Sequence, residues 1–537
     1  MEMAESLLDL HRFEQRKQEF QNIPVSEEIK KRNENYAVKL RKNKRDLHSA
    51  KRRILSSFTA PYSAVMNSDA DFFEIPKEIC ELYPGVNIED YDFDQRLLFL
   101  KRAINEIEET RIVLLGLVAF RKLSQKSSNS VPILVSLGLV DIALNFIDTK
   151  YEEPLRVEAS WILCNIAAGR EDFSKFLLEQ PALDKIFGLI DFNYSETSLH
   201  LIWTLANLCC SMVAAEKLIK IGVIDVIYEL LAKPRKIPLE FKQTCIWCLC
   251  NITKKSEIYD PDTVERILVC IGNSLIEEND NLIADCFWIL GCLTKTENSN
   301  IRYVRDSKYI SQAINGLKSD SDNVVQACMR LIGNVASGSV EDSLYLLKLK
   351  VLDSLIYLAE SKLPELLKDL YWTLSNIGAS DVFQASEIMK HEIVHKIIEA
   401  LLHEYLEVKK EAAHTISNML YKGSMDIVFR FMELEIFKTI SIGLKENDPE
   451  YLLLILEISK ELLVSCEEFG KINEALERFR SSGCLEAAEK LSSHKNPYVE
   501  RAVEEILKRY FDAENIVPWA SAIGGNRISS DVEVFII

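Results

Sequence analysis

A tryptophan followed four residues later by an asparagine recurs along the chain, and these two residue types could together bind a peptide. The aliphatic stem of a lysine or arginine can lie against an indole ring, whose face attracts the cationic head by about 0.5–2 kcal/mol. An asparagine amide offers one acceptor and two donors, enough to hold the C=O and N–H of an extended backbone. We call the recurring positions the ladder; they are Trp161 and Asn165, Trp203 and Asn207, Trp247 and Asn251, Trp288 and Cys292, Arg330 and Asn334, Trp372 and Asn376, and His414 and Asn418.

The ladder has a period near 42 residues, which is typical of HEAT and armadillo solenoids. The first residues of successive pairs are 42, 44, 41, 42, 42 and 42 residues apart. Five of the six tryptophans in the chain occupy this register. Positions i and i+4 lie on one face of a helix, and equivalent positions of stacked repeats align along one surface. The pattern therefore predicts a row of tryptophans beside a row of asparagines.

Acidic residues stand one helical turn before the ladder position in three repeats, at Asp285, Asp369 and Glu411. Carboxylates there would meet the cationic head of a side chain that lies between two indole rings. Together these residues predict a groove for an extended, basic peptide. The alternative is that the tryptophans pack between repeats and the asparagines cap or bridge helices. That alternative is the better reading of a single pair, whereas the recurrence in one register favours peptide binding.

The elements that must position the ladder are helices of one all-α stack. The chain has 537 residues, 48% of them hydrophobic and 27% charged, with few glycines and prolines, as expected for a helix-rich protein with a large core. Helical periodicity extends over 96–511 and predicts a right-handed solenoid of about ten repeats. Residues 59–95 are expected to be a linker and 512–537 a mobile tail. Ala119 and Leu456 take the tryptophan position in the flanking repeats, which are expected to be caps.

The charge of the chain is unevenly placed. The net charge is −18, yet residues 30–53 hold eleven Lys and Arg against two acidic residues, a net of +9, so the remainder sums to −27. A basic arm at 1–58 on an acidic body could bind nucleic acid, an acidic partner or the body itself. Only Tyr36 interrupts the charges, so base stacking has little support, and we expect no nucleic acid partner.

Catalytic and membrane functions have no support in the sequence. There is no phosphate-binding loop, no paired set of metal ligands and no Ser/His/Asp motif, so we expect no cofactor and no enzyme activity. Cys245, Cys248 and Cys250 have tempting metal spacing but lack a second pair of ligands, and the odd total of 13 cysteines suggests free thiols in a reducing compartment. No apolar run of 18 residues occurs, so no membrane insertion is expected.

The ladder and the basic arm together resemble the importin-α family, adaptors that carry proteins with basic nuclear localisation signals into the nucleus. The resemblance covers about 30–54 and 96–511 and implies an armadillo fold, shuttling between cytoplasm and nucleus, and an export receptor for recycling. It implies that the arm binds importin-β and that its last cluster, Lys51, Arg52 and Arg53, inhibits the chain's own groove. The arm matches the family's importin-β-binding segment at Lys30, Lys31, Arg32, Leu40, Arg41, Lys42, Lys44, Arg45, Lys51, Arg52 and Arg53.

The resemblance also implies two signal-peptide sites. The major site maps to Trp161, Asn165, Gly169, Ser174, Trp203, Asn207, Trp247, Asn251, Asp285 and Trp288. The minor site maps to Arg330, Asn334, Asp369, Trp372, Asn376, Glu411, His414 and Asn418. Three residues depart from the family pattern: Ser211 replaces an aspartate, His414 a tryptophan and Cys292 a tyrosine. The main alternative is an armadillo scaffold that binds other peptides in adhesion or signalling assemblies, although such a scaffold has no need of the basic arm.

Overall fold

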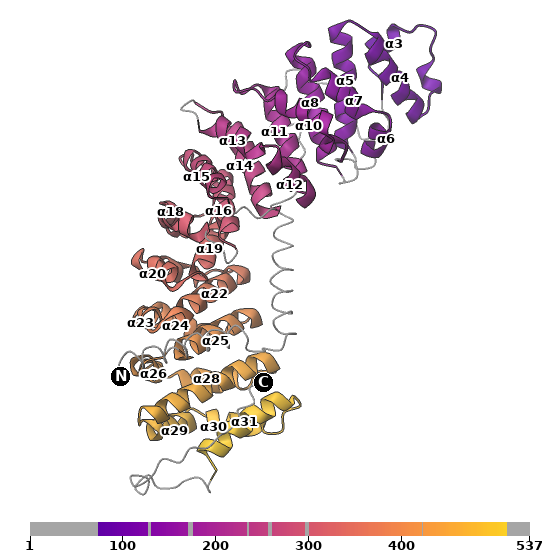
Figure 1. Ribbon diagram of the computed structural model, residues 1–537. Coiled ribbons are helices and arrows are strands. Elements are labelled where there is room, and N and C mark those ends of the chain that lie inside the picture. Colours follow the sequence, from indigo (N-terminus) through magenta and orange to yellow (C-terminus); the bar gives the residue numbers. More distant parts are fainter. Residues whose placement is uncertain are drawn as a thin grey trace. The chain divides into compact units, whose positions relative to one another are not determined.

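The structure, a computed structural model, describes residues 74–126, 130–169, 175–232, 236–255, 260–295, 300–421 and 423–512 (Figure 1). All of these residues lie within one unit, Arg52–Ile516. The regular elements in these ranges are α-helices and two short 3-10 helices. The predicted arm, 1–58, lies outside the described residues, as does the predicted tail, 512–537, apart from its first residue.

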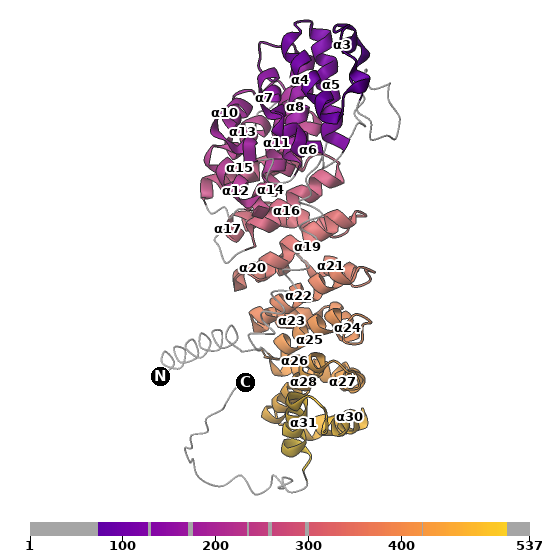
Figure 2. The same ribbon diagram turned by 90° about the vertical axis from the view of Figure 1, so that its right-hand side faces the viewer.

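Ten long helices carry the ladder and its flanking positions, and each of them contacts the next along the chain (Figures 1 and 2). This arrangement confirms the predicted all-α armadillo solenoid. Within the described residues the ten helices are α5 (Thr110–Lys126), α8 (Glu153–Ala167), α11 (Glu196–Leu208), α14 (Leu239–Lys255), α16 (Asp280–Leu293), α19 (Asp322–Ala336), α22 (Pro364–Ser380), α25 (Leu406–Tyr421), α28 (Pro449–Glu468) and α31 (Pro497–Tyr510).

The other helices connect these ten, and most of them are shorter. Figure 2 shows several of them beside the long helices of their own repeats. They are α3 (Lys77–Glu81), η1 (Ile88–Asp90), α4 (Phe93–Glu106), α6 (Ser130–Ser136), α7 (Leu139–Phe146), η2 (Lys175–Leu178), α10 (Gln180–Gly188), α12 (Met212–Lys220), α13 (Val223–Leu231), α15 (Pro261–Ser274), α17 (Asn300–Arg305), α18 (Tyr309–Gly316), α20 (Val340–Lys348), α21 (Leu352–Leu358), α23 (Val382–Lys390), α24 (Ile393–Ala400), α26 (Met425–Glu433), α27 (Ile436–Gly443), α29 (Ile472–Ser481) and α30 (Cys484–Leu491).

The turn before the second short helix of a repeat depends on glycine at two equivalent positions. Gly138 and Gly222 precede α7 and α13 with φ of 79° and 93°, a left-handed conformation that residues with a Cβ rarely adopt. Asp141 and Asp225 follow in the first turns of those helices, where a negative charge stabilises the helix dipole. The same local sequence therefore makes the same turn 84 residues apart.

A short helix stands within residues 59–95, the range that the sequence predicts to be a linker. Helix α3 lies inside the range expected to be irregular, and Ile79 on it has no exposed surface. Ile75 is also buried, and both belong to the continuous apolar core of the solenoid. The three prolines between residues 61 and 84 obscured this short helix, because proline sits at its N-cap, Pro76, rather than inside it.

The cysteines with metal-like spacing lie inside the core. Cys245, Cys248 and Cys250 are fully buried on α14, and burial raises the pKa of the Cys250 thiol to about 12.

Within the part of the chain that the structure describes, no helix is long and apolar enough to span a bilayer.

Candidate peptide-binding site

The structure brings the ladder residues onto neighbouring helices, and the central tryptophans contact each other. The rings of Trp203 on α11 and Trp247 on α14 have centroids 6.3 Å apart and planes inclined at 70°, an edge-to-face contact. Trp161 on α8 packs with Trp203 through Cys164. No side chain fits between rings in direct contact. The slot that we expected between Trp203 and Trp247 is therefore closed in this structure, and a peptide side chain would need an indole ring to turn.

The five ladder tryptophans differ in exposure. Trp161 and Trp247 are only 3% and 1% exposed, whereas Trp203, Trp288 and Trp372 are half-buried. A half-buried ring still offers surface to a partner, so these three can contact a peptide without rearrangement. Packing between repeats, the alternative considered for the sequence, accounts for the other two.

An arginine of the chain itself covers the first ladder tryptophan. The guanidinium carbon of Arg121, on α5, lies 4.2 Å from the centroid of the Trp161 ring. Arg121 Nε donates to Glu158 Oε2 at 2.5 Å, and both residues are more than 90% buried. Burial raises the pKa of Glu158, an effect that the Arg121 charge opposes. Sequence analysis missed this pair, although Glu158 precedes Trp161 by three residues, the same offset as the acidic residues before Trp288 and Trp372.

Two further ladder positions also have cations from the chain. Lys254 is buried, and its Nζ lies 5.7 Å from the centroid of the Trp288 ring, within the range of a cation–π contact. Arg330 Nη2 lies 3.3 Å from Asp369 Oδ2, so one of the acids expected to meet a peptide cation has an arginine beside it. These contacts make Trp161, Trp288 and Asp369 less accessible to a peptide than the sequence suggested.

The ladder asparagines bridge successive repeats. In each of five cases the amide Nδ2 donates to the preceding long helix: Asn165 to Ser124 Oγ at 3.0 Å, Asn207 to the Cys164 carbonyl at 3.3 Å, Asn251 to the Ala206 carbonyl at 3.0 Å, Asn334 to the Gly291 carbonyl at 2.7 Å and Asn418 to the Ser375 carbonyl at 3.3 Å. Asn165, Asn207 and Asn251 have no exposed surface. The structure therefore shows the asparagines bridging helices, which was the alternative to peptide binding.

Some polar atoms of the ladder make no hydrogen bond. Among the described residues, Oδ1 of Asn165, Oδ1 of Asn251 and Nδ2 of Asn376 are buried without a partner. A buried polar atom without a partner costs free energy, typically 1–3 kcal/mol. Because these atoms are buried, a peptide backbone would reach them only after the side chains around them had moved.

The predicted minor site contains a carboxyl group that is hard to ionise. Burial raises the pKa of Glu411 to about 7; Lys368 opposes this shift, and the carboxylates of Asp369 and Glu407 add to it. Burial also lowers the pKa of His414 one turn further along α25. At neutral pH His414 is thus an uncharged ring where five other repeats have an indole.

The raised pKa of Glu411 predicts a pH-dependent cost to stability. A carboxyl whose folded pKa lies above its ordinary value of 4.5 stabilises the fold only while protonated, and that contribution is lost as the pH rises toward 7. Glu411→Gln stays neutral and should therefore be more stable than the parent at pH 8 by roughly 3 kcal/mol, since the pKa rises from 4.5 to about 7 and one pKa unit corresponds to about 1.4 kcal/mol. Denaturant midpoints at pH 4 and pH 8 measure this. The exposed Glu404, changed to Gln, is the control, and an equal response of both variants to pH would contradict the prediction.

Of the remaining predicted residues, one lies at the end of a described range and the others lie outside the described residues. Gly169 is half-buried just after α8, and a Cβ there would lie 3.0 Å from the Ile166 carbonyl oxygen. Ser174, which is also predicted for the major site, lies outside the described residues, as do all the predicted importin-β-binding residues.

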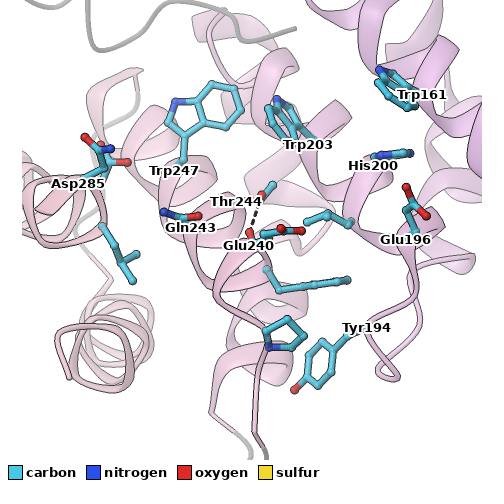
Figure 3. Close-up of a pocket in the computed structure, with 15 residues that line it drawn as sticks. Trp161, Tyr194, Glu196, His200, Trp203, Glu240, Gln243, Thr244, Trp247 and Asp285 are labelled. Atoms are coloured by element: carbon cyan, nitrogen blue, oxygen red, sulfur yellow. Dashed lines mark hydrogen bonds between the residues drawn. The ribbon is translucent and has the colours of Figure 1, made fainter. Parts of the chain in front are cut away.

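A cavity of about 450 Å³ opens beside the central tryptophans. Helices α8, α11, α14 and α16 line it, and Trp161, Trp203, Trp247 and Asp285 from the predicted major site reach it (Figure 3). It also contains residues that sequence analysis did not single out, among them Glu196, Glu240 and His200. The structure thus combines aromatic walls with carboxylates, which is the chemistry that binds a cationic side chain.

Comparison with known proteins places the chain near one family. Importin subunit alpha-5 of Arabidopsis thaliana is 22% identical over 291 residues, 54% of this chain and 51% of that protein. Importin subunit alpha-B of Dictyostelium discoideum is 23% identical over 297 residues, 55% of this chain and 53% of that protein. The chain therefore spans about half the length of the curated relatives it matches. No family model matches it.

A crystal structure of an engineered protein aligns with 78% of this chain and 98% of its own, with 17% sequence identity and a TM-score of 0.65. That likeness concerns the fold alone. The stacked long helices and the ladder on them define an armadillo-repeat protein. The relatives that the chain is similar to are importin alpha subunits, and together with the fold they support an importin-α-like armadillo-repeat protein.

Proposed function

We propose that this chain is a nuclear import adaptor that binds basic nuclear localisation signals along its ladder. The observation that carries the proposal is the cavity beside Trp203 and Trp247, where aromatic rings and carboxylates from three successive repeats meet. Equivalent residues on α11, α14 and α16 follow one another along the stack. An extended peptide could therefore contact successive repeats with successive side chains. The relatives named importin subunit alpha support the same function.

The basic arm is proposed to connect the loaded adaptor to importin-β. Residues 30–53 carry a net charge of +9 and suit an acidic partner. Return of the emptied adaptor from the nucleus would need an export receptor, so the protein would be found in both cytoplasm and nucleus.

A second candidate function is a scaffold that binds other peptides. The specific observation in its favour is that Arg121 and Lys254 lie over ladder tryptophans, which reduces the number of rings open to basic side chains. A pull-down with a lysine-rich signal peptide, using the full-length protein and a variant lacking residues 1–58, separates the two functions. Capture of the peptide by the shortened variant and of importin-β only by the full-length chain would support the adaptor. Capture of neither would leave the scaffold.

The arm is further expected to inhibit the ladder until importin-β binds it. Lys51, Arg52 and Arg53 have the composition of a signal, and covalent attachment gives them an effective concentration of up to about millimolar. Changing all three to alanine should therefore raise the affinity for a basic peptide at least tenfold at low salt, and the gain should fade as salt rises. Peptide titration at two salt concentrations measures this.

The matched control changes three exposed lysines of the solenoid, Lys438, Lys490 and Lys508, to alanine. This variant has the same net charge as the arm variant but an intact arm. If the parent, the arm variant and the control bind equally well at low salt, the arm is not an inhibitor.

A further inference from the structure

A second row of residues runs parallel to the tryptophan row in the central repeats. Seven residues before Trp203, Trp247 and Trp288 stand Glu196, Glu240 and Asn281, and all three line the cavity. Three residues before the same tryptophans stand His200, Thr244 and Asp285, which also line it. Positions i, i+4 and i+7 lie on one helical face, so each helix presents a column that ends in an indole ring. In the view of Figure 3, Glu196 and Glu240 lie below the rings of Trp203 and Trp247.

The two glutamates have no cationic partner. Both are exposed at the start of their helices, and within the described residues neither side-chain carboxylate accepts a hydrogen bond or forms an ion pair; the Thr244 hydroxyl donates to the backbone carbonyl of Glu240 instead. Burial and the carboxylates of Glu153 and Glu240 raise the pKa of Glu196. Two like charges that face one cavity repel each other, and a cation between them removes that repulsion.

His200 places a hydrogen-bond acceptor deeper in the cavity. The ring is 4% exposed, and Nδ1 lies 3.3 Å from the Val157 carbonyl and 3.2 Å from Ser160 Oγ. The Ser160 hydroxyl donates to the Val157 carbonyl at 2.8 Å, so both oxygens act as acceptors toward Nδ1, which therefore carries the proton. Nε2 is left as an acceptor and makes no hydrogen bond in the described part of the chain. Burial lowers the pKa of His200 to about 4, so the ring is neutral at physiological pH.

The ligand that fits this set is a flat cation with several donors. A lysine ammonium is a compact point charge, whereas a guanidinium presents five N–H donors in a plane and stacks on aromatic rings. The cavity matches a guanidinium. It has two carboxylates at its mouth, a neutral imidazole acceptor inside and the rings of Trp203 and Phe241 along its walls.

We propose that this cavity binds an arginine side chain of the peptide that lies along the ladder, and that the chain therefore prefers arginine to lysine at one peptide position. The inference rests on the proposed function and specifies its ligand. Glu196 and Glu240 would accept from the guanidinium, and His200 Nε2 would accept from a further N–H. The tryptophan ladder alone does not distinguish the two basic residues, because either stem can lie on an indole ring.

The test is an arginine scan. A lysine-only octapeptide and eight peptides with one arginine each are titrated against the full-length chain carrying alanine at Lys51, Arg52 and Arg53, so that the arm does not compete. One position is expected to bind about tenfold more tightly with arginine, as added hydrogen bonds between charged partners allow. Glu196→Gln with Glu240→Gln should abolish that preference.

A matched double variant, Glu216→Gln with Glu265→Gln, removes the same charge from exposed sites on α12 and α15 that do not line the cavity. It should weaken all peptides alike and keep the preference. If the lysine-only peptide binds but no arginine position is favoured, or both double variants lose the preference equally, this inference is overturned while the proposed function stands. If none of the peptides binds, the proposed function itself fails.

Discussion

Replacing Arg121 by alanine is expected to destabilise the solenoid by about 3–5 kcal/mol, the cost of leaving one member of a buried ion pair without its partner. Arg121 and Glu158 are 8% and 9% exposed and join α5 to α8. The guanidinium also lies on the Trp161 ring, so the substitution removes a cation–π contact as well. Chemical denaturation of the full-length protein measures the loss.

Two variants show whether burial of the charge is the cause. Arg121→Met with Glu158→Met removes both charges at similar volume and should stay within about 1 kcal/mol of the parent, because no unpaired charge remains. Arg102→Ala breaks an exposed pair with Glu106, whose side chains are 70% and 46% exposed, and should cost under about 1 kcal/mol. If Arg121→Ala costs no more than Arg102→Ala, the Arg121–Glu158 pair does not hold the first repeats together.

The double variant also bears on ligand binding. With Arg121 gone, the face of Trp161 is no longer covered by a cation of the chain. A basic peptide that reaches α8 should then bind more tightly to the double variant than to the parent. An unchanged affinity would mean that the peptide does not extend to Trp161.

The repeat and its helices could be predicted from the sequence because a period of 42 residues is fixed by the need to bury each repeat against its neighbours. That argument located the ladder positions on consecutive long helices. It did not locate α3, because this helix is too short to show a helical period. Ile79 on α3 and Ile75 just before it are both buried, and the local sequence does not indicate their burial.

The side-chain roles within the ladder could be predicted only in part. The spacing of Trp161 and Asn165 shows that both lie on one face, but not whether that face meets solvent or the preceding helix. The structure gives Asn165 a donor role toward Ser124 on α5 and leaves its Oδ1 without a partner. Arg121 was not predicted because its own repeat has no tryptophan to mark the register. Glu158 was not predicted although it stands three residues before Trp161, the offset of the other acidic residues. Glu196 and Glu240 were not predicted because they stand seven residues before a tryptophan, not three.

Truncating Trp203 to alanine is expected to weaken binding of an octapeptide of alternating lysine and arginine about thirtyfold, or roughly 2 kcal/mol. The ring is half-buried, lines the cavity and is held by Trp247 on one side and by the Trp161–Cys164 cluster on the other. A ring that is already ordered but still exposed loses little entropy when a ligand covers it, which is why such residues dominate binding. Titration is done with the Lys51, Arg52 and Arg53 alanine variant as parent.

Trp372→Ala is the matched control, since it removes the same half-buried ring from α22, four repeats away from α11 and outside the cavity. A peptide of eight residues held at the cavity should lose less than about threefold in affinity there, because its contacts are centred on the three repeats around Trp203 and Trp247. Unfolding midpoints must be compared for both variants, as each truncation also removes core contacts. Trp203→Ala with an intact fold and an affinity within threefold of the parent would mean that the row of tryptophans serves only to pack the repeats, and the scaffold function would then have the stronger support.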